Sequence, residues 1–118
     1  MTTPRPEIVL IAGEADVWRG PVEELIAGRI DLQALDPSAA LPETLDPHAV
    51  KVMVASPQDA KTFAPYFPNL QWIQSTWAGV DALAGDIPES VAITPLRGVF
   101  GQAMSEFVLG WILGLERN

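Results

Sequence analysis

The chain has 118 residues, of which 48% are hydrophobic and 19% charged, and this composition indicates one folded domain large enough to bury a core. Its net charge of −8, without any cluster of Lys and Arg, argues against binding to nucleic acid or to an anionic membrane. No apolar run reaches the roughly 18 residues of a membrane span. Cysteine is absent, which excludes disulfides and thiol nucleophiles and fits a cytoplasmic protein.

The beginning of the chain alternates predicted strands with a predicted helix. Residues 7–13, EIVLIAG, form a continuous apolar run ending in glycine, which is typical of a buried parallel strand. Residues 20–30 predict a helix with Pro21 in its first turn and Gly28 at its end. Residues 31–35 then alternate like a short edge strand.

The same alternation continues along the chain. A proline-rich loop, residues 36–48, is followed by a strand over 50–55 and a short helix over 57–67. A second strand over 70–75, a short helix over 80–85 and a short strand over 91–96 come next. Because strands and helices alternate throughout, we expect an α/β fold with right-handed crossovers. The best-fitting architecture is flavodoxin-like and doubly wound, with a mostly parallel sheet of five strands.

The last predicted helix, residues 101–118, is the longest and is almost entirely apolar from Ala103 to Leu115. A helix that is apolar on all sides has to be buried on all sides. It is either a well-buried core helix or a helix between two domains, the second being absent from this chain. Gly110 and Gly114 would let another backbone approach closely. We expect homo-oligomers through this helix, because exposed apolar patches drive association.

Residue types that carry catalytic chemistry do not form a recognisable constellation. His48, the only histidine, shares no motif with a carboxylate or a nucleophile. Glu14 and Asp16 follow the first strand, where a receiver domain holds magnesium, but its other ligands are missing and solvated loop acids are favoured. Ser56 and Ser75 lack a partner base and a GxSxG context. We therefore predict no catalytic residue and no metal site in this chain.

The stretch STWAGVD, residues 75–81, forms a small-residue elbow between a predicted strand and a predicted helix. Ala78 and Gly79 leave the backbone uncovered, and the first N–H groups of a helix beginning at Val80 would attract an anion. Asp81 would instead act as a cap for that helix. The pattern leaves a carboxylate- or phosphate-binding elbow and a plain turn equally open.

Two blocks of the second half, LQWIQSTWAGVDAL and VAITPLRGVFGQAMSEFVLGWILGLER, together resemble the D-isomer-specific 2-hydroxyacid dehydrogenases, closest to their glyoxylate/hydroxypyruvate reductase-like branch. The resemblance implies a two-domain oxidoreductase that interconverts a small 2-keto acid and its D-2-hydroxy acid by hydride transfer with NAD or NADP. It implies that residues 1–118 are the N-terminal portion of the substrate-binding (catalytic) domain. The Rossmann domain and the catalytic Arg, Glu and His would be absent from this chain, which alone should be inactive and bind no cofactor.

The resemblance also implies a substrate site at the elbow. Backbone N–H groups of Ala78, Gly79 and Val80 would hold the carboxylate of the 2-keto acid. Trp77 stands where the family usually has a small residue, so its indole would either wall the substrate pocket or pack on the absent domain. Asp81 would brace the elbow.

The cofactor side of the cleft is implied by the second block. Arg97 and Gly98 would begin the loop that lines the cleft, and Met104 would lie near the nicotinamide. The alternative to this enzyme fragment is a stand-alone flavodoxin-like binding or interaction module, which dimerises through its apolar C-terminal helix.

Overall fold

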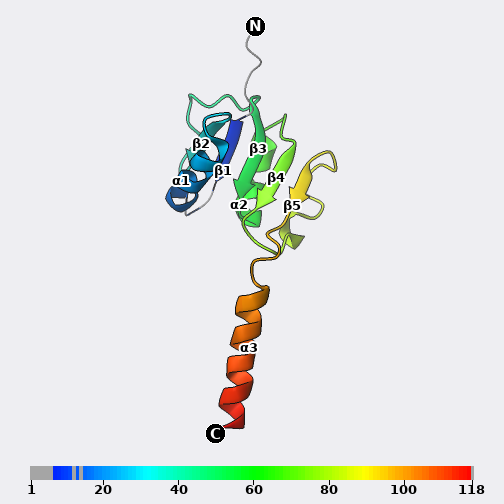
Figure 1. The fold of residues 1–118 in the computed structure, drawn as a ribbon. Coiled ribbons are helices and arrows are strands. Elements are labelled where there is room, and N and C mark those ends of the chain that lie inside the picture. The colour runs from blue at the N-terminus through cyan, green and yellow to red at the C-terminus, as the bar shows by residue number, and fades with distance from the viewer. Residues whose placement is uncertain (1–6, 12, 14, 118) are drawn as a thin grey trace.

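A parallel sheet lies at the centre of the protein in the computed structural model, which describes residues 7–11, 13 and 15–117 (Figure 1). The strands are β1 Glu7–Ile11, β2 Asp31–Leu35, β3 Val50–Ala55, β4 Trp72–Ser75 and β5 Ala92–Thr94. They lie side by side in the order β2-β1-β3-β4-β5, and all neighbours pair in parallel. This is the order of flavodoxin-like doubly wound sheets. The predicted α/β class and the parallel sheet are therefore confirmed.

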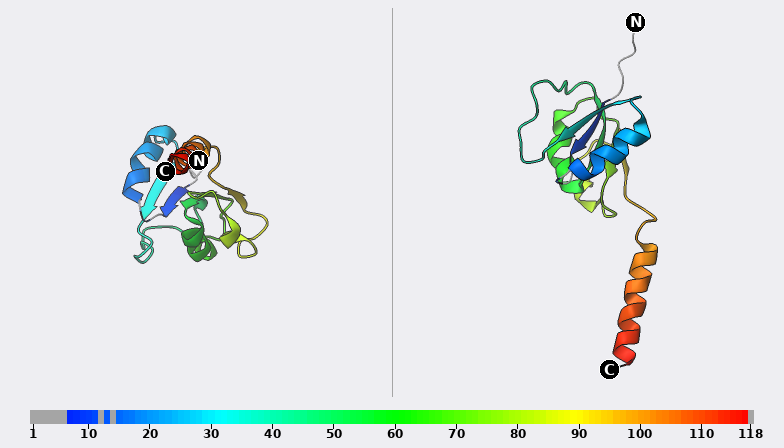
Figure 2. Two further views of the ribbon diagram at one scale, coloured as in Figure 1. Left: turned by 90° about the horizontal axis from the view of Figure 1, so that it is seen from below. Right: turned by 60° about the vertical axis from the view of Figure 1, so that its left-hand side comes forward.

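Helices α1 and α2 cover opposite faces of the sheet (Figure 2). Helix α1, Ala15–Ile26, packs on β1 and β2, whereas α2, Pro57–Phe63, packs on β3 and β4. From β1 the chain moves outward to β2, and from β3 it moves in the opposite direction to β5. Right-handed crossovers in opposite directions place their helices on opposite faces.

The hydrophobic core lies between the sheet and α2. Alternate residues of a strand point to the same face, and Met53 and Ala55 of β3 and Ile73 of β4 are fully buried on the α2 side. The other core residues come from α2 and the loops around it, among them Ala60, Phe63, Phe67, Leu70 and Leu83. The core therefore supports β3 and β4, the two central strands that precede the candidate site.

Helix α1 begins earlier than the sequence predicts. The expected start at residue 20 is wrong, because the helix begins at Ala15 and contains Pro21 in its interior. Asp16 in the first turn stabilises this start through the helix dipole. The predicted end is close to the observed one: the helix stops at Ile26, and Gly28 follows with a φ of 70°.

Helix α2 is shorter than the predicted helix over residues 57–67. It ends at Phe63 and continues as the 3-10 helix η1, Ala64–Tyr66. Ser56 is its N-cap, since Ser56 Oγ accepts a hydrogen bond from the Asp59 N–H at 3.2 Å and donates one to Asp59 Oδ2 at 2.9 Å. Ser56 therefore has a structural role at the start of α2.

Helix α3, Gly101–Glu116, projects away from the sheet (Figure 1). The molecule consequently extends over 68 Å along its longest axis. The interpretation of this segment as a well-buried core helix is wrong, because no residue of α3 is buried. Among the residues described, no helix is long and apolar enough to cross a membrane.

Candidate functional site

A tight turn at the carboxyl end of β4 shapes the elbow. The Ser75 side chain is 1% exposed, and its Oγ accepts a hydrogen bond from the Trp77 N–H and donates one to the Trp77 carbonyl, both at 3.0 Å. Such a side chain-to-backbone turn redirects the chain directly after the strand. Ser75 is therefore a structural residue that sets the direction of the elbow.

Backbone hydrogen bonds tie the elbow to both neighbouring strands. The Thr76 N–H donates to the Ala55 carbonyl at the end of β3, and the Leu96 N–H donates to the Trp77 carbonyl, both at 3.0 Å. The second bond joins the elbow to the loop after β5. Leu96 is not among the residues predicted for the site, because a contact made by its backbone leaves no signal in its side-chain type.

The elbow presents its backbone to solvent. Trp77, Ala78 and Gly79 are exposed, whereas Val80 is half-buried and packs against the core. The N–H groups of Ala78, Gly79 and Val80 donate to no acceptor among the described residues. A Cβ built on Gly79 would meet nothing within 4 Å. The elbow thus combines three consecutive N–H groups that are free among the described residues with open space beside the Gly79 Cα.

The predicted helix after the elbow is wrong. Only a three-residue 3-10 helix, η2 Asp81–Leu83, forms there, and Val80 before it is not helical. The Asp81 side chain makes no capping hydrogen bond, so the predicted cap is wrong. Without an α-helix there is also no helix dipole to attract an anion. A segment of six residues closed by Gly85 at a φ of 81° is too short to continue as an α-helix. Leu83, which is 1% exposed, anchors the turn in the core.

The other predicted site residues are Arg97 and Gly98, in the loop after β5, and Met104, in the helix that follows this loop. Arg97 directly follows Leu96, is exposed, and makes no hydrogen bond or ion pair with any described residue. Gly98 adopts a φ of 76°, a left-handed conformation in which the chain turns toward α3. Met104 lies in the first turn of α3, also exposed. Arg97 and Gly98 therefore directly follow the residue whose N–H is bonded to the elbow, whereas Met104 belongs to the projecting helix.

The predicted loop acids show no metal centre. Glu14 lies outside the described residues, and Asp16 lies in the first turn of α1. At the end of β2, the Ser38 hydroxyl and N–H donate to Asp36 Oδ1 at 2.6 and 2.9 Å and lower the pKa of Asp36. In the described part of the chain, no three acidic or imidazole side chains gather closely enough to hold a metal ion. His48 is an exposed loop residue beside Asp46.

Replacing Ser75 with alanine is expected to lower the free energy of unfolding by about 1–3 kcal/mol, because the Trp77 N–H loses its acceptor beside the core. Chemical denaturation followed by circular dichroism measures the loss. Ser90→Ala is the matched control, since Ser90 is exposed and makes no hydrogen bond with a described residue. Equal stabilities of the two variants would contradict a structural role of Ser75.

The fold and the strand order define a flavodoxin-like α/β domain with a solvent-exposed backbone elbow. No known protein-family profile matches the chain, and no curated protein matches it either. Among solved structures, a D-isomer specific 2-hydroxyacid dehydrogenase family protein from Aeromonas salmonicida subsp. salmonicida A449 is similar to it, with 25% sequence identity and a TM-score of 0.76. The match covers 96% of this chain and 36% of that protein. The resemblance predicted from the sequence is confirmed: this chain is similar over nearly its whole length to part of a dehydrogenase-family protein.

Proposed function

We propose that this chain is the substrate-binding domain of an NAD(P)-dependent D-2-hydroxyacid dehydrogenase of the glyoxylate/hydroxypyruvate reductase-like branch, working in the cytoplasm. In this proposal the elbow binds the carboxylate of a small 2-keto acid. The supporting observation is that Ala78, Gly79 and Val80 present three consecutive unpaired N–H groups at the carboxyl end of a parallel strand. Ligands of open α/β sheets bind at this edge.

The chemistry of the elbow suits a carboxylate. Each carboxylate oxygen accepts hydrogen bonds from N–H donors, and such charge-assisted bonds are stronger than neutral ones. Gly79 leaves room for the ligand to reach the backbone, since open space lies where a side chain would project. Arg97, which has no ion-pair partner among the described residues, supplies the nearest cation along the connected loop. Local donors of this kind are needed because the chain as a whole carries a charge of −8.

Trp77 has a distinct place in the proposal. Its side chain is 63% exposed, so the indole is not needed to complete the core. An indole beside the carboxylate donors would wall the pocket and restrict it to small 2-keto acids. Packing of the same side chain on a nucleotide-binding domain is the alternative, and both roles would leave the stability of this domain nearly unchanged on Trp77→Ala.

The proposed hydride transfer uses a nicotinamide cofactor, and the chain has no GxGxxG fingerprint with which to bind one. In the whole enzyme, a Rossmann domain would bind NAD or NADP and face the elbow across a cleft. The cofactor would supply the hydride. This domain would hold the substrate carboxylate and contribute Arg97, Gly98 and Met104 to the cleft. The chain spans 36% of the length of the similar protein, so the activity of a whole enzyme and the role of this domain in it are both proposals.

Separate binding measurements on the purified chain test whether it binds the 2-keto acid without binding the cofactor. Calorimetric titration with glyoxylate or hydroxypyruvate is expected to give weak, millimolar binding, because an open elbow excludes little water. Titration with NADH, followed by its fluorescence, is expected to give no binding. Keto-acid-dependent oxidation of NADH by this chain alone, or binding of NADH without binding of either keto acid, would overturn the proposal.

A stand-alone module that dimerises through α3 is the second candidate function. The exposed apolar surface of that helix favours it. A module of this kind would bind no 2-keto acid at the elbow, so the same titration distinguishes the two functions.

A further inference from the structure

One face of the sheet is only half covered. Helix α1 packs on β1 and β2, and Figure 1 shows β3, β4 and β5 with no helix in front of them, since α2 lies behind the sheet. Parallel sheets occur almost only in proteins whose helices cover both faces. The uncovered half, which lies over β3, β4 and β5 and which we call the open face, therefore offers a place for one more helix.

The open face carries the side chains that point away from α2. Successive residues of a strand point to opposite faces, and Met53 of β3 and Ile73 of β4 belong to the core on the α2 side. Their neighbours in the strands therefore lie on the open face, and none of these neighbours is fully buried. They are Val52 and Val54 of β3, Trp72 and Gln74 of β4, and, in register with these, Ala92 and Thr94 of β5.

The polar side chains of the open face are bonded to one another. Trp72 Nε1 donates to Thr94 Oγ1 at 2.8 Å, and Thr94 Oγ1 donates to Gln74 Oε1. Gln74 Nε2 in turn donates to the Ser75 carbonyl at 3.0 Å. Burying a polar group is costly when the group loses its hydrogen-bond partner. An apolar helix can therefore cover these residues without breaking any of these bonds.

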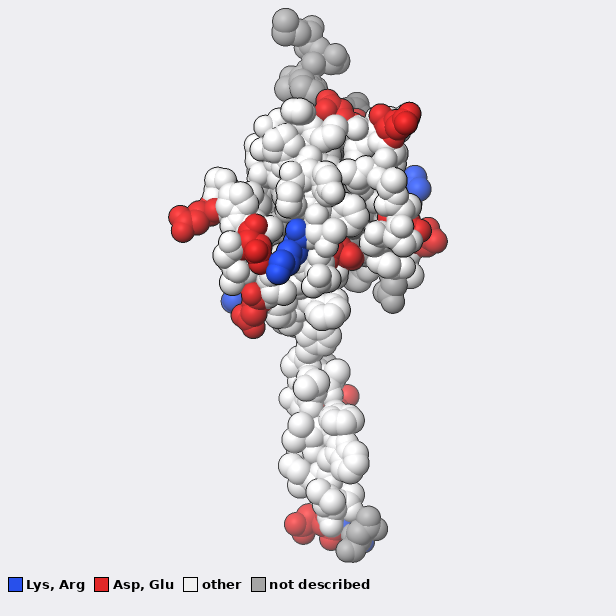
Figure 3. Space-filling model, turned by 180° about the vertical axis from the view of Figure 1, so that it is seen from behind, with Lys and Arg blue, Asp and Glu red and all other residues white. Residues whose placement is uncertain are grey.

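Helix α3 has an apolar surface without a partner. No residue of α3 is buried, and Figure 3 shows a largely uncharged surface along the helix. A helix of this length is only marginally stable by itself in water, and most helices are stabilised by packing of one face. Five exposed residues recur at the spacing of one helix face and form what we call the apolar row, Met104, Phe107, Val108, Trp111 and Leu115.

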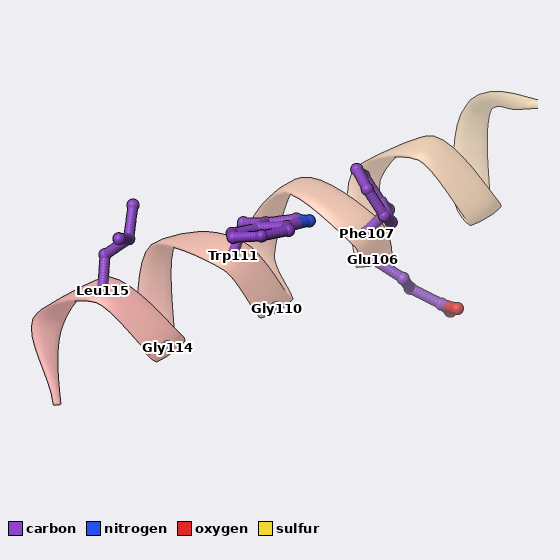
Figure 4. A pocket seen from close by; sticks show the side chains of 6 residues that line it. All are labelled: Glu106, Phe107, Gly110, Trp111, Gly114 and Leu115. Carbon is purple, nitrogen blue, oxygen red and sulfur yellow. The ribbon is translucent and has the colours of Figure 1, made fainter. Parts of the chain in front are cut away.

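The polar residues of α3 lie on the side opposite the apolar row. With about 100° of rotation per residue, Gln102 lies opposite Trp111. Gln102 Nε2 donates to Glu106 Oε1 at 2.9 Å, and Figure 4 shows Glu106 pointing away from Phe107, Trp111 and Leu115. The helix can therefore bury its apolar row while its polar side chains stay in water.

Two glycines reduce the bulk of α3 on one flank of the apolar row. Gly110 and Gly114 leave a groove of about 420 Å³ there (Figure 4). A backbone without side chains can approach another element closely. On this flank the helix can consequently lie close to the sheet.

A short connection joins α3 to the sheet. The Leu96 N–H donates to the Trp77 carbonyl, which fixes the chain up to this residue. Residues 97–100 then lead into α3, and Gly98 among them adopts a φ of 76°. Four extended residues span at most about 14 Å, whereas stacked layers lie about 10 Å apart. The connection is long enough for α3 to turn back onto the sheet, and Figure 2 shows in its view from below that α3 lies on the α1 side.

The dimensions of α3 and of the open face agree. A helix of 16 residues is about 24 Å long and about 10 Å wide with its side chains. The six residues of β3 extend over about 20 Å. Three neighbouring strands, about 4.8 Å apart, span about 10 Å between the outer two. One helix that runs antiparallel to the strands therefore fills the open face.

We propose that α3 docks on the open face of its own sheet, with the apolar row against the strands and Gly98 as the hinge. The docked helix completes the second helical layer of the doubly wound fold, and the projecting helix of Figure 1 is the undocked form. The helix then packs within its own chain, whereas the sequence pattern alone also allows a second copy as its partner. The proposal depends on no substrate or cofactor, so it can fail while the proposed function stands.

Small-angle X-ray scattering, with the mass taken from light scattering, tests the docked form on the 118-residue chain. The undocked form has a radius of gyration of 17.8 Å, whereas a compact domain of 118 residues has one of about 13–14 Å. The wild type is expected to be a monomer with the smaller value. Trp111→Glu, which places a charge in the apolar row, is expected to be a monomer with the larger value.

Leu113→Glu is the matched control, because it places the same charge on the polar side of α3. It is expected to remain as compact as the wild type. Both side chains are exposed in the undocked form, at 60% for Trp111 and 63% for Leu113, so neither replacement removes a residue from the core. Circular dichroism checks that both variants keep the sheet.

A disulfide tests the position of the docked helix, because the chain has no cysteine of its own. The double variant Val52→Cys with Val108→Cys is expected to form an intramolecular disulfide at low micromolar concentration, since Val108 lies over β3 in the docked form. Val52→Cys with Glu106→Cys is the control. It is expected to form no intramolecular disulfide, because residue 106 then points to solvent.

Three results would overturn the proposal. The first is a monomeric wild type with a radius of gyration close to 17.8 Å, and the second is a Trp111→Glu variant as compact as the wild type. The third is an intramolecular disulfide that forms equally fast in both cysteine pairs or in neither. A wild-type dimer that Trp111→Glu dissociates would also overturn it and assign the apolar row to a second copy, and flotation with phosphatidylcholine vesicles would assign it to a lipid surface.

Discussion

Replacing Leu83 with alanine is expected to lower the free energy of unfolding by about 2–5 kcal/mol, the cost of removing a fully buried leucine from a packed core. Leu83 is 1% exposed and belongs to η2, which packs against α2 directly after the elbow. A domain of this size is stabilised by only about 5–15 kcal/mol in total. The substitution should therefore unfold a measurable fraction of the chain in mild denaturant.

Leu25→Ala is the matched control for this experiment. Leu25 is 77% exposed on α1, so the same chemical change should alter the stability by less than about 0.5 kcal/mol. Urea denaturation of both variants, followed by circular dichroism, measures the difference. A loss in Leu83→Ala no larger than in Leu25→Ala would show that η2 does not anchor the elbow in the core.

Replacing Gly79 with leucine is expected to weaken the binding of glyoxylate or hydroxypyruvate at least tenfold while leaving the fold intact. Gly79 is exposed, and its φ lies outside the left-handed region where a side chain would be strained. Nothing within 4 Å would contact an added Cβ. Neither the backbone conformation nor the packing of this chain requires glycine at this position. The side chain would instead occupy the space from which a carboxylate reaches the free N–H groups.

Calorimetric titration of wild type and Gly79→Leu measures this effect. Gly20→Leu, which places the same side chain on α1 far from the elbow, provides the control, since Gly20 is likewise exposed with open space around it. If Gly79→Leu binds the 2-keto acid as tightly as the wild type while Gly20→Leu binds it more weakly, the binding site does not lie at the elbow.

The architecture could be predicted from the sequence because its strands are strongly patterned. Residues 50–55 and 70–75 are rich in apolar residues that favour strands, either in alternation with polar ones or in a continuous run. Both segments contain central strands of the sheet. The order of strands and helices then restricts the topology, since parallel strands need right-handed crossovers. Burial of the two central strands against α2 is the physical basis of this agreement.

Helix boundaries were harder to predict, because local signals competed. Pro21 suggests a first turn, yet the start of α1 at Ala15 places it inside the helix, where the loss of one backbone hydrogen bond is tolerated. The segment after the elbow has helical spacing, but the burial of Leu83 favours a single 3-10 turn. In both cases tertiary context outweighed the local pattern.

In the candidate site, the features that depend on residue type could be predicted, whereas those that depend on backbone hydrogen bonds could not. The small residues Ala78 and Gly79 indicate exposed backbone, and both residues are exposed. The helix dipole expected to attract an anion is absent, because only a 3-10 turn follows the elbow, and the free N–H groups are the donors that remain. The bond from Leu96 to Trp77 could not be predicted, since it joins two loops that are distant in sequence.

A titration of the ¹⁵N-labelled chain with glyoxylate, followed by amide chemical shifts, tests directly whether the elbow binds a carboxylate. We expect saturable shifts that are largest at the amides of Ala78, Gly79 and Val80, and no such shifts with hydroxyacetone, which has a keto group but no carboxylate. Shifts that cluster elsewhere on the sheet, or that are equally large with hydroxyacetone, would contradict a carboxylate site at the elbow.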